Sequence, residues 1–331
     1  EGGRLSPDPT IDHTVTAAEA DRTVPALLRE LLPGTSWSTA KELCRSGRVY
    51  VDGSRVLDPA ARVAAGSRVE IHPDGPALPR GPLAPEALVH FDPDLVVVDK
   101  PAGLLTAPFA GERDTLVTLT RTLLGRREAA GGTGGAGGRG PALRVVQRLD
   151  KETSGLLVFA RSIGAERELQ RQLGEHTVTR RYLALVHGAA RDGTHETLLV
   201  ADRGDGRRGS WGVFRRAKGE PPPNARQAIT HVRVVERLPG ATLVACELET
   251  GRQHQIRIHL SEAGHPLLGE RVYVPADRRE GGPLLQAPRP MLHATLLGFA
   301  HPRNGRPMRF EAPPPADFLA LLARLRQGSS R

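Results

Sequence analysis

Segments with the pattern of β-strands constrain this fold most, because they outnumber helical segments and do not alternate with them. In the second half of the chain four strand-like segments follow one another, at residues 182–186, 227–235, 241–249 and 252–259. Regular alternation of strands and helices would indicate a doubly wound parallel sheet. The order found here predicts an α+β domain built around a mixed, mainly antiparallel sheet.

The N-terminal part is expected to form a small separate unit. Residues 1–20 are polar and are interpreted as a flexible arm. Residues 21–71 combine apolar positions at helical spacing with two short strand-like segments. This pattern predicts a small sheet and two helices, the second of them capped by Ser38. The proline- and glycine-rich stretch at residues 72–87 is typical of a linker.

The larger domain is expected at residues 88–315, followed by a C-terminal helix and tail at 316–331. Within it, residues 131–140 are mostly glycine. These glycines lack the preceding strand and following helix that a phosphate-binding loop requires. They are therefore interpreted as a flexible insert.

The charge of the chain favours a polyanionic partner. Its 331 residues include 46 Lys and Arg against 37 Asp and Glu, a net charge of +9. This surplus is typical of nucleic-acid binding, although charge alone also fits a need for solubility. The two cysteines, Cys44 and Cys246, form neither a metal cluster nor a disulfide framework, which favours the cytoplasm. No apolar run reaches the roughly 18 residues that span a bilayer, so no membrane partner is expected.

The segment from Gln147 to Gly155 contains the strongest candidate for a catalytic group. Asp150 lies between Arg148 and Lys151 and is followed by a Thr-Ser-Gly turn and an apolar run at residues 156–160. A carboxylate at the edge of a buried strand needs partners to remain charged. Asp150 is therefore predicted to be functional.

Three further segments of the large domain carry residues that could do chemistry. Residues 98–104 contain a sharp break after an apolar strand, which ordinary turn chemistry also explains. In residues 179–188 a basic pair precedes Tyr182, whose ring could stack on a base or belong to the core. Residues 249–260 place Arg252 after a glycine turn, where its guanidinium could reach a carboxylate. Zinc binding is not predicted, because the two histidines of this segment are unsuitably spaced and lack further ligands.

Together these segments resemble the RluA-type family of pseudouridine synthases, over residues 88–315 and in the family's order. The resemblance rests on Arg148-Leu149-Asp150 with its Thr-Ser-Gly turn, on the run from Thr250 to Arg257, and on the closing segment at 292–302. Residues 21–71 resemble the alpha-L RNA-binding domain shared with a small-subunit ribosomal protein. The implied activity is isomerisation of uridine in RNA to pseudouridine, which needs no cofactor or metal.

The resemblance implies roles for individual residues. Asp150 would be the nucleophile, Arg252 the cation that pairs with it, and Tyr182 a residue that stacks on the uracil and assists proton removal. Among substrate-binding residues, Arg148 would replace the extruded uridine or hold it, and Ile256 would pack against its ring; Lys100 is assigned to the same group. Many relatives have a histidine where this chain has Gln147. A glutamine keeps a hydrogen bond but loses a titratable group, and activity is expected to survive.

The substrate is expected to be RNA, and ribosomal RNA of the large subunit is favoured over transfer RNA. The protein is expected to be a monomer. A transfer-RNA enzyme and a non-catalytic RNA-binding factor of ribosome assembly are the alternatives. A nucleoside hydrolase is disfavoured, because such chemistry usually needs a second carboxylate. The basic segment 203–218, with Trp211 and Phe214, fits either an RNA contact or a solvated loop anchored by its aromatics.

Overall fold

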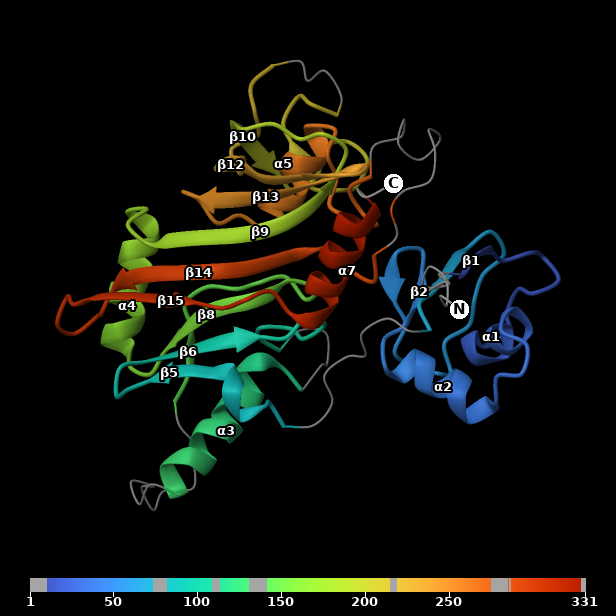
Figure 1. The fold of residues 1–331 in the computed structure, drawn as a ribbon, viewed down its shortest axis with the longest axis horizontal. Coiled ribbons are helices and arrows are strands. Elements are labelled where there is room, and N and C mark those ends of the chain that lie inside the picture. The colour runs from blue at the N-terminus through green and yellow to red at the C-terminus, as the bar shows by residue number, and fades with distance from the viewer. Residues whose placement is uncertain are drawn as a thin grey trace. The chain divides into compact units, whose positions relative to one another are not determined.

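The computed structural model describes residues 11–73, 82–108, 114–130, 142–214, 219–274, 285 and 287–328. The chain divides into two units, Glu1–Arg80 and Gly81–Arg331 (Figure 1). The insert predicted at residues 131–140 lies outside the described residues, and the linker predicted at 72–87 lies only partly within them. In the described parts of the chain, no helix is both long and apolar enough to cross a membrane.

The first unit contains two short helices and a small antiparallel sheet. The helices are α1 (Val24–Leu31) and α2 (Trp37–Arg45), and the strands are β1 (Ile11–Thr14), β2 (Val49–Val51), β3 (Ser54–Arg55) and β4 (Arg68–Ile71), in the order β1-β4-β2-β3. The core includes Leu27 and Leu28 of α1 and Cys44 of α2. Asp52 and Gly53 have φ of 50° and 74°, as a tight turn between β2 and β3 requires.

Two predictions for the first unit are wrong. Part of the expected N-terminal arm is strand β1, which pairs with β4 and packs Ile11 against the core; residues 1–10 lie outside the described residues. The cap of α2 is Ser36, whose Oγ accepts a hydrogen bond from the Thr39 amide at 3.1 Å. The Ser36 backbone is extended, as a helix cap requires, whereas Ser38 already lies inside the helix.

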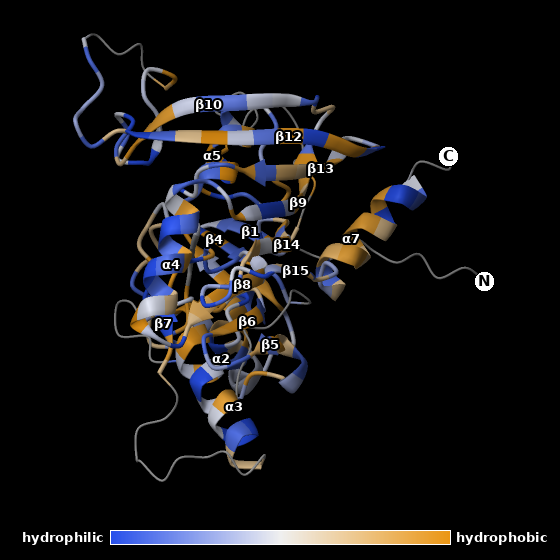
Figure 2. Ribbon diagram, turned by 90° about the vertical axis from the view of Figure 1, so that its left-hand side faces the viewer, coloured by the Kyte–Doolittle hydropathy of each residue, from blue (hydrophilic) through white to orange (hydrophobic). Residues whose placement is uncertain are grey.

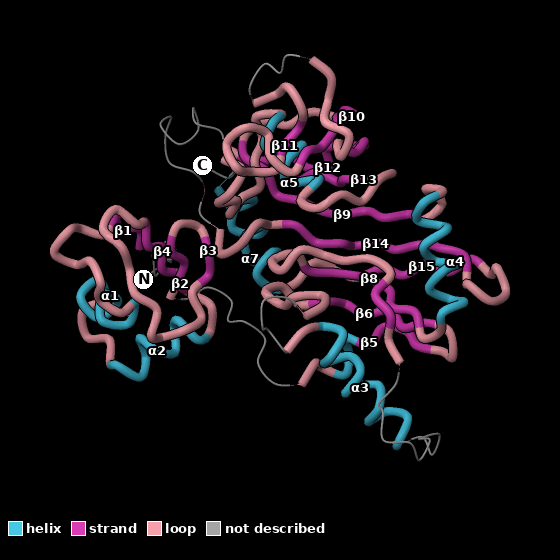
Figure 3. Tube along the Cα trace, turned by 180° about the vertical axis from the view of Figure 1, so that it is seen from behind, coloured by secondary structure: helices cyan, strands magenta, loops and turns pink. Residues whose placement is uncertain are grey.

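The second unit contains one large sheet, in the order β11-β10-β12-β13-β9-β14-β8-β6-β5. Its strands are β5 (Leu88–Phe91), β6 (Leu95–Lys100), β7 (Arg144–Val145), β8 (Ser154–Ala160), β9 (Thr179–His187), β10 (Gly193–Val200), β11 (Gly209–Ser210), β12 (Arg226–Leu238), β13 (Ala241–Leu248), β14 (Leu292–Ala300) and β15 (Pro307–Glu311). Figure 3 shows β9, β14 and β8 side by side in its middle. Among the described pairings of this sheet, β8 with β14 is parallel and the others are antiparallel, which confirms the predicted α+β class.

Helices cover parts of this sheet and complete its core. They are η1 (Pro85–Ala87), α3 (Leu116–Ala130), α4 (Ile163–Gly174), α5 (Gln255–Glu262) and α7 (Ala316–Gln327). Buried residues of α3 and α5 join one cluster, whereas α4 and α7 each contribute to a separate one. Figure 2 shows β12 changing between hydrophobic and hydrophilic colours along its length, in keeping with side chains that alternate between core and solvent.

The strand predicted at residues 252–259 is instead the beginning of helix α5. The prediction rested on the alternation of Ile256, Ile258 and Leu260 with polar residues. In the structure all residues from Gln255 to Ser261 are buried, the polar ones included. An alternating pattern indicates a strand only where one face is exposed, so here it carried no information about secondary structure.

Candidate active site

A cavity of about 1030 Å³ in the second unit brings distant parts of the chain together. Its walls come from residues within the ranges 105–108, 145–153, 173–182 and 248–257, though not from every residue of these ranges, and from Leu292. Five of the six residues predicted from sequence line it: Arg148, Asp150, Tyr182, Arg252 and Ile256. The sixth, Lys100, does not line it.

The loop that carries Asp150 is held by hydrogen bonds from both sides. The Thr106 hydroxyl donates to the Leu149 carbonyl at 3.0 Å, and the same hydroxyl accepts a hydrogen bond from the Leu149 amide at 3.2 Å. The Thr153 amide donates to the Asp150 carbonyl at 3.1 Å, which closes the turn. The side chain of Asp150 is 23% exposed and faces the cavity.

Lys100 supports this loop from beneath instead of contacting substrate as predicted. Its side chain is fully buried at the end of β6, and its Nζ donates to the carbonyls of Pro101, Leu104 and Lys151 at 3.0, 2.7 and 2.9 Å. Burial lowers the pKa of Lys100 to about 7, against the opposing charge of Glu152. The segment at 98–104 thus positions the neighbour of Asp150, which agrees with its structural interpretation.

The cation beside Asp150 is Arg257, and not Arg252 as the sequence predicted. Arg257 Nη1 lies 3.8 Å from Asp150 Oδ2, whereas Arg252 is exposed and its Nε donates to the Gln227 carbonyl at 3.0 Å. His254 Nε2 lies 3.8 Å from Asp150 Oδ1. His254 precedes α5 as its N-cap and Arg257 lies in the first turn of the helix, so the start of α5 brings both side chains near Asp150. The wrong assignment therefore follows from the wrong secondary structure.

Glu270, which the sequence analysis missed, fixes the orientation of Arg257. Its side chain is fully buried and accepts from Arg257 Nε and Nη2, both at 2.7 Å. Burial alone would raise the pKa of Glu270, but Arg257 and the amides of Val272 and Tyr273 hold it below its usual value. Burial lowers the pKa of Arg257, but the charge and hydrogen bonds of Glu270, together with the charge of Asp150, more than offset this and raise it. The guanidinium thus stays charged, with Nη1 left to face Asp150.

His254 is a second site residue that the sequence analysis missed, after Glu270. The sequence analysis considered it only as a zinc ligand. Its φ of 59° places it in the left-handed region at the N-terminus of α5, and its Nδ1 lies 2.7 Å from the Tyr273 hydroxyl. Burial lowers the pKa of His254, and the Asp150 carboxylate offsets this only partly. Burial also raises the pKa of Tyr273 to about 12. Both side chains are therefore uncharged at neutral pH.

The remaining predicted residues give the cavity a buried aromatic ring, an apolar side chain and an exposed cation. Tyr182 is 8% exposed, and burial raises the pKa of its hydroxyl to about 12 even though Arg180 opposes the shift. Ile256 is buried on α5, and Arg148 is exposed at the rim. Among the described residues that line the cavity, Asp150 is the one carboxylate, beside five Lys and Arg residues. Such a cavity favours a polyanionic substrate.

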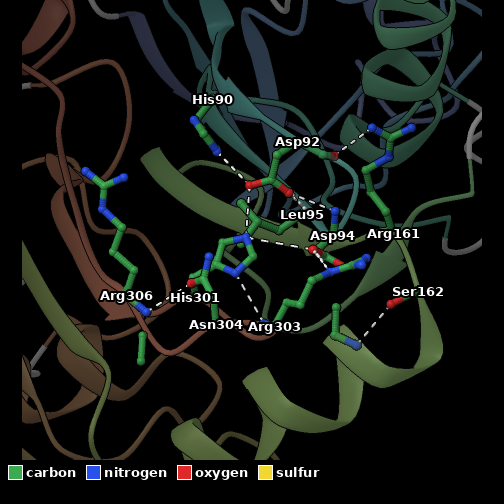
Figure 4. Close-up of polar contacts among 12 residues, drawn as sticks. His90, Asp92, Asp94, Leu95, Arg161, Ser162, His301, Arg303, Asn304 and Arg306 are labelled. Carbon is green, nitrogen blue, oxygen red and sulfur yellow. Dashed lines mark hydrogen bonds and ion pairs between the residues drawn. The ribbon is translucent and has the colours of Figure 1, made fainter. Parts of the chain in front are cut away.

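A possible metal cluster lies away from this cavity, at the turns between β5 and β6 and between β14 and β15 (Figure 4). Ligand atoms of Asp92, Asp94 and His301 lie within 4.8 Å of one another. The Asp94 carboxylate accepts from Arg303 Nε and Nη2, both at 2.6 Å. Asp92 Oδ1 accepts the amides of Asp94 and Leu95, and its Oδ2 lies 2.9 Å from His90 Nε2 and 3.2 Å from that of His301. These atoms thus hydrogen-bond to one another and to neighbouring groups, and they join the two turns.

Comparison with known proteins identifies related sequences over nearly the whole chain. The family model described as RNA pseudouridylate synthase matches residues 94–262, and that of the S4 domain matches residues 22–69. The ribosomal large subunit pseudouridine synthase D of Xylella fastidiosa is 36% identical over 96% of this chain and 93% of its own length. An uncharacterized RNA pseudouridine synthase of Bacillus subtilis, YlyB, is 34% identical over 96% and 98% of the two chains.

Solved structures with a similar fold are also known. The human RNA pseudouridylate synthase domain containing 4 protein matches with a TM-score of 0.54 and 23% identity, over 73% of this chain and 93% of that one. The human domain containing 1 protein matches with a TM-score of 0.51 and 25% identity, over 71% and 86%.

Proposed function

Because this chain belongs to the RNA pseudouridylate synthase family and is a pseudouridine synthase, we propose that it modifies ribosomal RNA of the large subunit, with Asp150 as nucleophile. The observation that carries the assignment of Asp150 is its position as the one carboxylate among the described residues of the cavity, with Arg257 at 3.8 Å. The names of several relatives support the substrate, as does the S4 match. Cytoplasmic action, as a monomer, belongs to the same proposal.

The reaction exchanges one bond for another within the uridine. The bond from the sugar to nitrogen breaks, the base turns, and a carbon of the ring bonds to the sugar; the proton of that carbon then leaves, and the freed nitrogen takes up a proton. Atoms and charge balance without a cofactor. A carboxylate nucleophile must remain ionised, and a fixed cation nearby stabilises that form. Arg257, held by Glu270, has this position.

Other residues would receive the base after it leaves the RNA stack. A stacked uridine has to be extruded before an enzyme can reach it. Tyr182 and Ile256 then offer a ring and an apolar side chain on which the uracil can lie. The raised pKa of Tyr182 favours this stacking role over that of a base in the resting enzyme. Arg148, exposed at the rim, would replace the base or hold the extruded nucleotide. Arg252, also exposed, would contact the RNA.

The test is conversion of an unmodified large-subunit ribosomal RNA transcript, with pseudouridine mapped chemically. The wild type should form pseudouridine at defined positions, and Asp150→Asn should lose about 10³-fold or more of the rate, as removal of a nucleophile does. Asp99→Asn is the matched control, because Asp99 is a partly buried carboxylate that does not line the cavity and whose pKa burial raises to about 6. Full activity of Asp150→Asn would contradict the assignment of the nucleophile. Conversion of transfer RNA instead would contradict the substrate.

A further inference from the structure

Arg180 is a buried cation in the wall of the cavity, and the proposed reaction assigns it no role. It precedes Tyr182 by two residues on β9, so both side chains lie on the same face of the sheet. Arg180 is 8% exposed and lines the cavity. Its Nη2 donates to the carbonyls of Leu248 and Glu249 at 3.4 and 2.7 Å.

The protein provides no counter-charge for this guanidinium among the residues that the structure describes. Arg257, Arg289 and Arg203 are similarly buried, and each forms an ion pair with a carboxylate. No described carboxylate forms one with Arg180, and its buried Nε has no hydrogen-bond partner. Burial lowers the pKa of Arg180, and the charge of Arg252 lowers it further. A buried guanidinium without a counter-charge or a full set of hydrogen bonds is unfavourable unless a bound ligand supplies them.

The backbone opposite Arg180 leaves room for its guanidinium. A Cβ atom at Gly251 would lie 2.5 Å from Arg180 Nη1, far closer than two such atoms can approach. Glycine at this position therefore lets the guanidinium lie against the chain beside Arg252. Arg252 and His176 also line this part of the cavity, so an anion placed there meets several positive or neutral groups.

We propose that Arg180 binds the phosphate attached to the uridine that occupies the cavity. The guanidinium has a planar set of donors that suits phosphate oxygens, and the anion supplies the counter-charge that the described residues do not. The proposal rests on the proposed function in one respect, that a nucleotide of RNA enters this cavity. It assigns a phosphate subsite next to the stacking position of Tyr182.

The neighbouring residue Arg181 provides a matched control. It lies on the same strand but lines a different cavity, of about 540 Å³, and its Nη2 lies 2.7 Å from Glu247 Oε1. The two residues thus carry the same charge at adjacent positions, and only Arg180 lacks an ion pair within the described structure.

The experiment measures binding of uridine, uridine 5′-monophosphate and uridine 3′-monophosphate to the full chain by calorimetry. In the wild type and in Arg181→Met, at least one monophosphate should bind about tenfold or more tightly than uridine, as one charge-assisted contact provides. In Arg180→Met this preference should fall below about threefold, while binding of uridine itself is retained. Thermal unfolding of each variant verifies that it is folded.

A second variant moves the guanidinium without removing it. In Gly251→Ala the new methyl group should displace Arg180 Nη1 and reduce the preference for the monophosphate, although the charge remains. Equal preference for the monophosphates in wild type and Arg180→Met, or no preference in the wild type, would overturn the proposal. Binding is measured without turnover. The phosphate subsite can therefore be contradicted while pseudouridine is still formed, and it can be supported even if the protein modifies another RNA.

Discussion

At the scale of single residues, the immediate surroundings of Asp150 come from groups that lie about one hundred positions away in the chain. Glu270 fixes Arg257, and Arg257 faces Asp150 through the remaining nitrogen. At 3.8 Å the two charges attract without the short, paired hydrogen bonds that would engage both carboxylate oxygens. This arrangement places a positive charge beside the carboxylate that we propose as nucleophile, without engaging both of its oxygens.

Buried histidines make the stability of the second unit sensitive to acid. His293 has its Nδ1 3.0 Å from the Ser154 hydroxyl and its Nε2 3.1 Å from the Ala312 carbonyl. Burial lowers its pKa to about 4 from a usual value of 6.5. Between these values the unfolded chain binds the proton and the folded chain does not, so the free energy of unfolding falls as the pH falls through this window. His259 shows the same shift for the same reason.

We expect urea unfolding to show a loss of stability between pH 6.5 and pH 4, of up to about 1.4 kcal/mol per pH unit for each histidine. In His293→Gln the loss over this range should be smaller, since glutamine does not titrate. An identical pH dependence of wild type and His293→Gln would contradict the prediction.

At the scale of elements, short polar contacts decide where helices begin and how loops are held. Arg289 is fully buried; its Nε lies 2.7 Å from Asp317 Oδ2 in α7, and its Nη1 donates to the Glu152 carbonyl at 3.0 Å. The C-terminal helix is thereby connected to the loop that carries Asp150. Lys100 holds the same loop through the Lys151 carbonyl. Two fully buried basic side chains thus position the turn that carries Asp150.

The cap of α2 gives a prediction with a close control. Ser36→Ala should destabilise the first unit by about 1 kcal/mol, because the Thr39 amide loses its acceptor. Ser38→Ala, two residues away and inside the helix, should change stability by less than about 0.5 kcal/mol. Urea unfolding of the two variants provides the comparison. A larger effect of Ser38→Ala would instead favour the cap expected from the sequence.

At the scale of the whole molecule, each unit has its own hydrophobic core. In the first unit, residues of α1, α2, β2 and β4 form one buried cluster, and no residue of the second unit belongs to it in the described structure. Separate cores are what independently folding units require. We therefore propose that the division predicted near residues 72–87 separates an RNA-binding unit from a catalytic one.

Removal of residues 1–81 should leave the second unit folded, with circular dichroism and cooperative thermal unfolding retained. Its affinity for the ribosomal RNA transcript should fall, and the dependence of affinity on salt should become less steep, because fewer phosphates are contacted. Dissociation constants measured at several salt concentrations test this. An unchanged salt dependence would indicate that the first unit contributes no phosphate contacts.

Much of this architecture could be predicted from local patterns. The two helices of the first unit and the strands at 182–186 and 241–249 were predicted, and they are α1, α2, β9 and β13. The sequence pattern was misleading at α5, where every side from Gln255 to Ser261 is buried. It also failed at β1, a short strand whose place depends on its pairing with β4.

The sequence by itself determined the fold class, the family and the position of Asp150, because these depend on local order and on motifs read along the chain. Only the tertiary structure decided that Arg257 and not Arg252 faces Asp150, that Lys100 is buried beneath the loop, and that Arg180 has no ion pair within the described residues. The physical reason is that the state of a charged group depends on partners brought close by packing. For Asp150 this partner is Arg257, which helix α5 places beside the carboxylate.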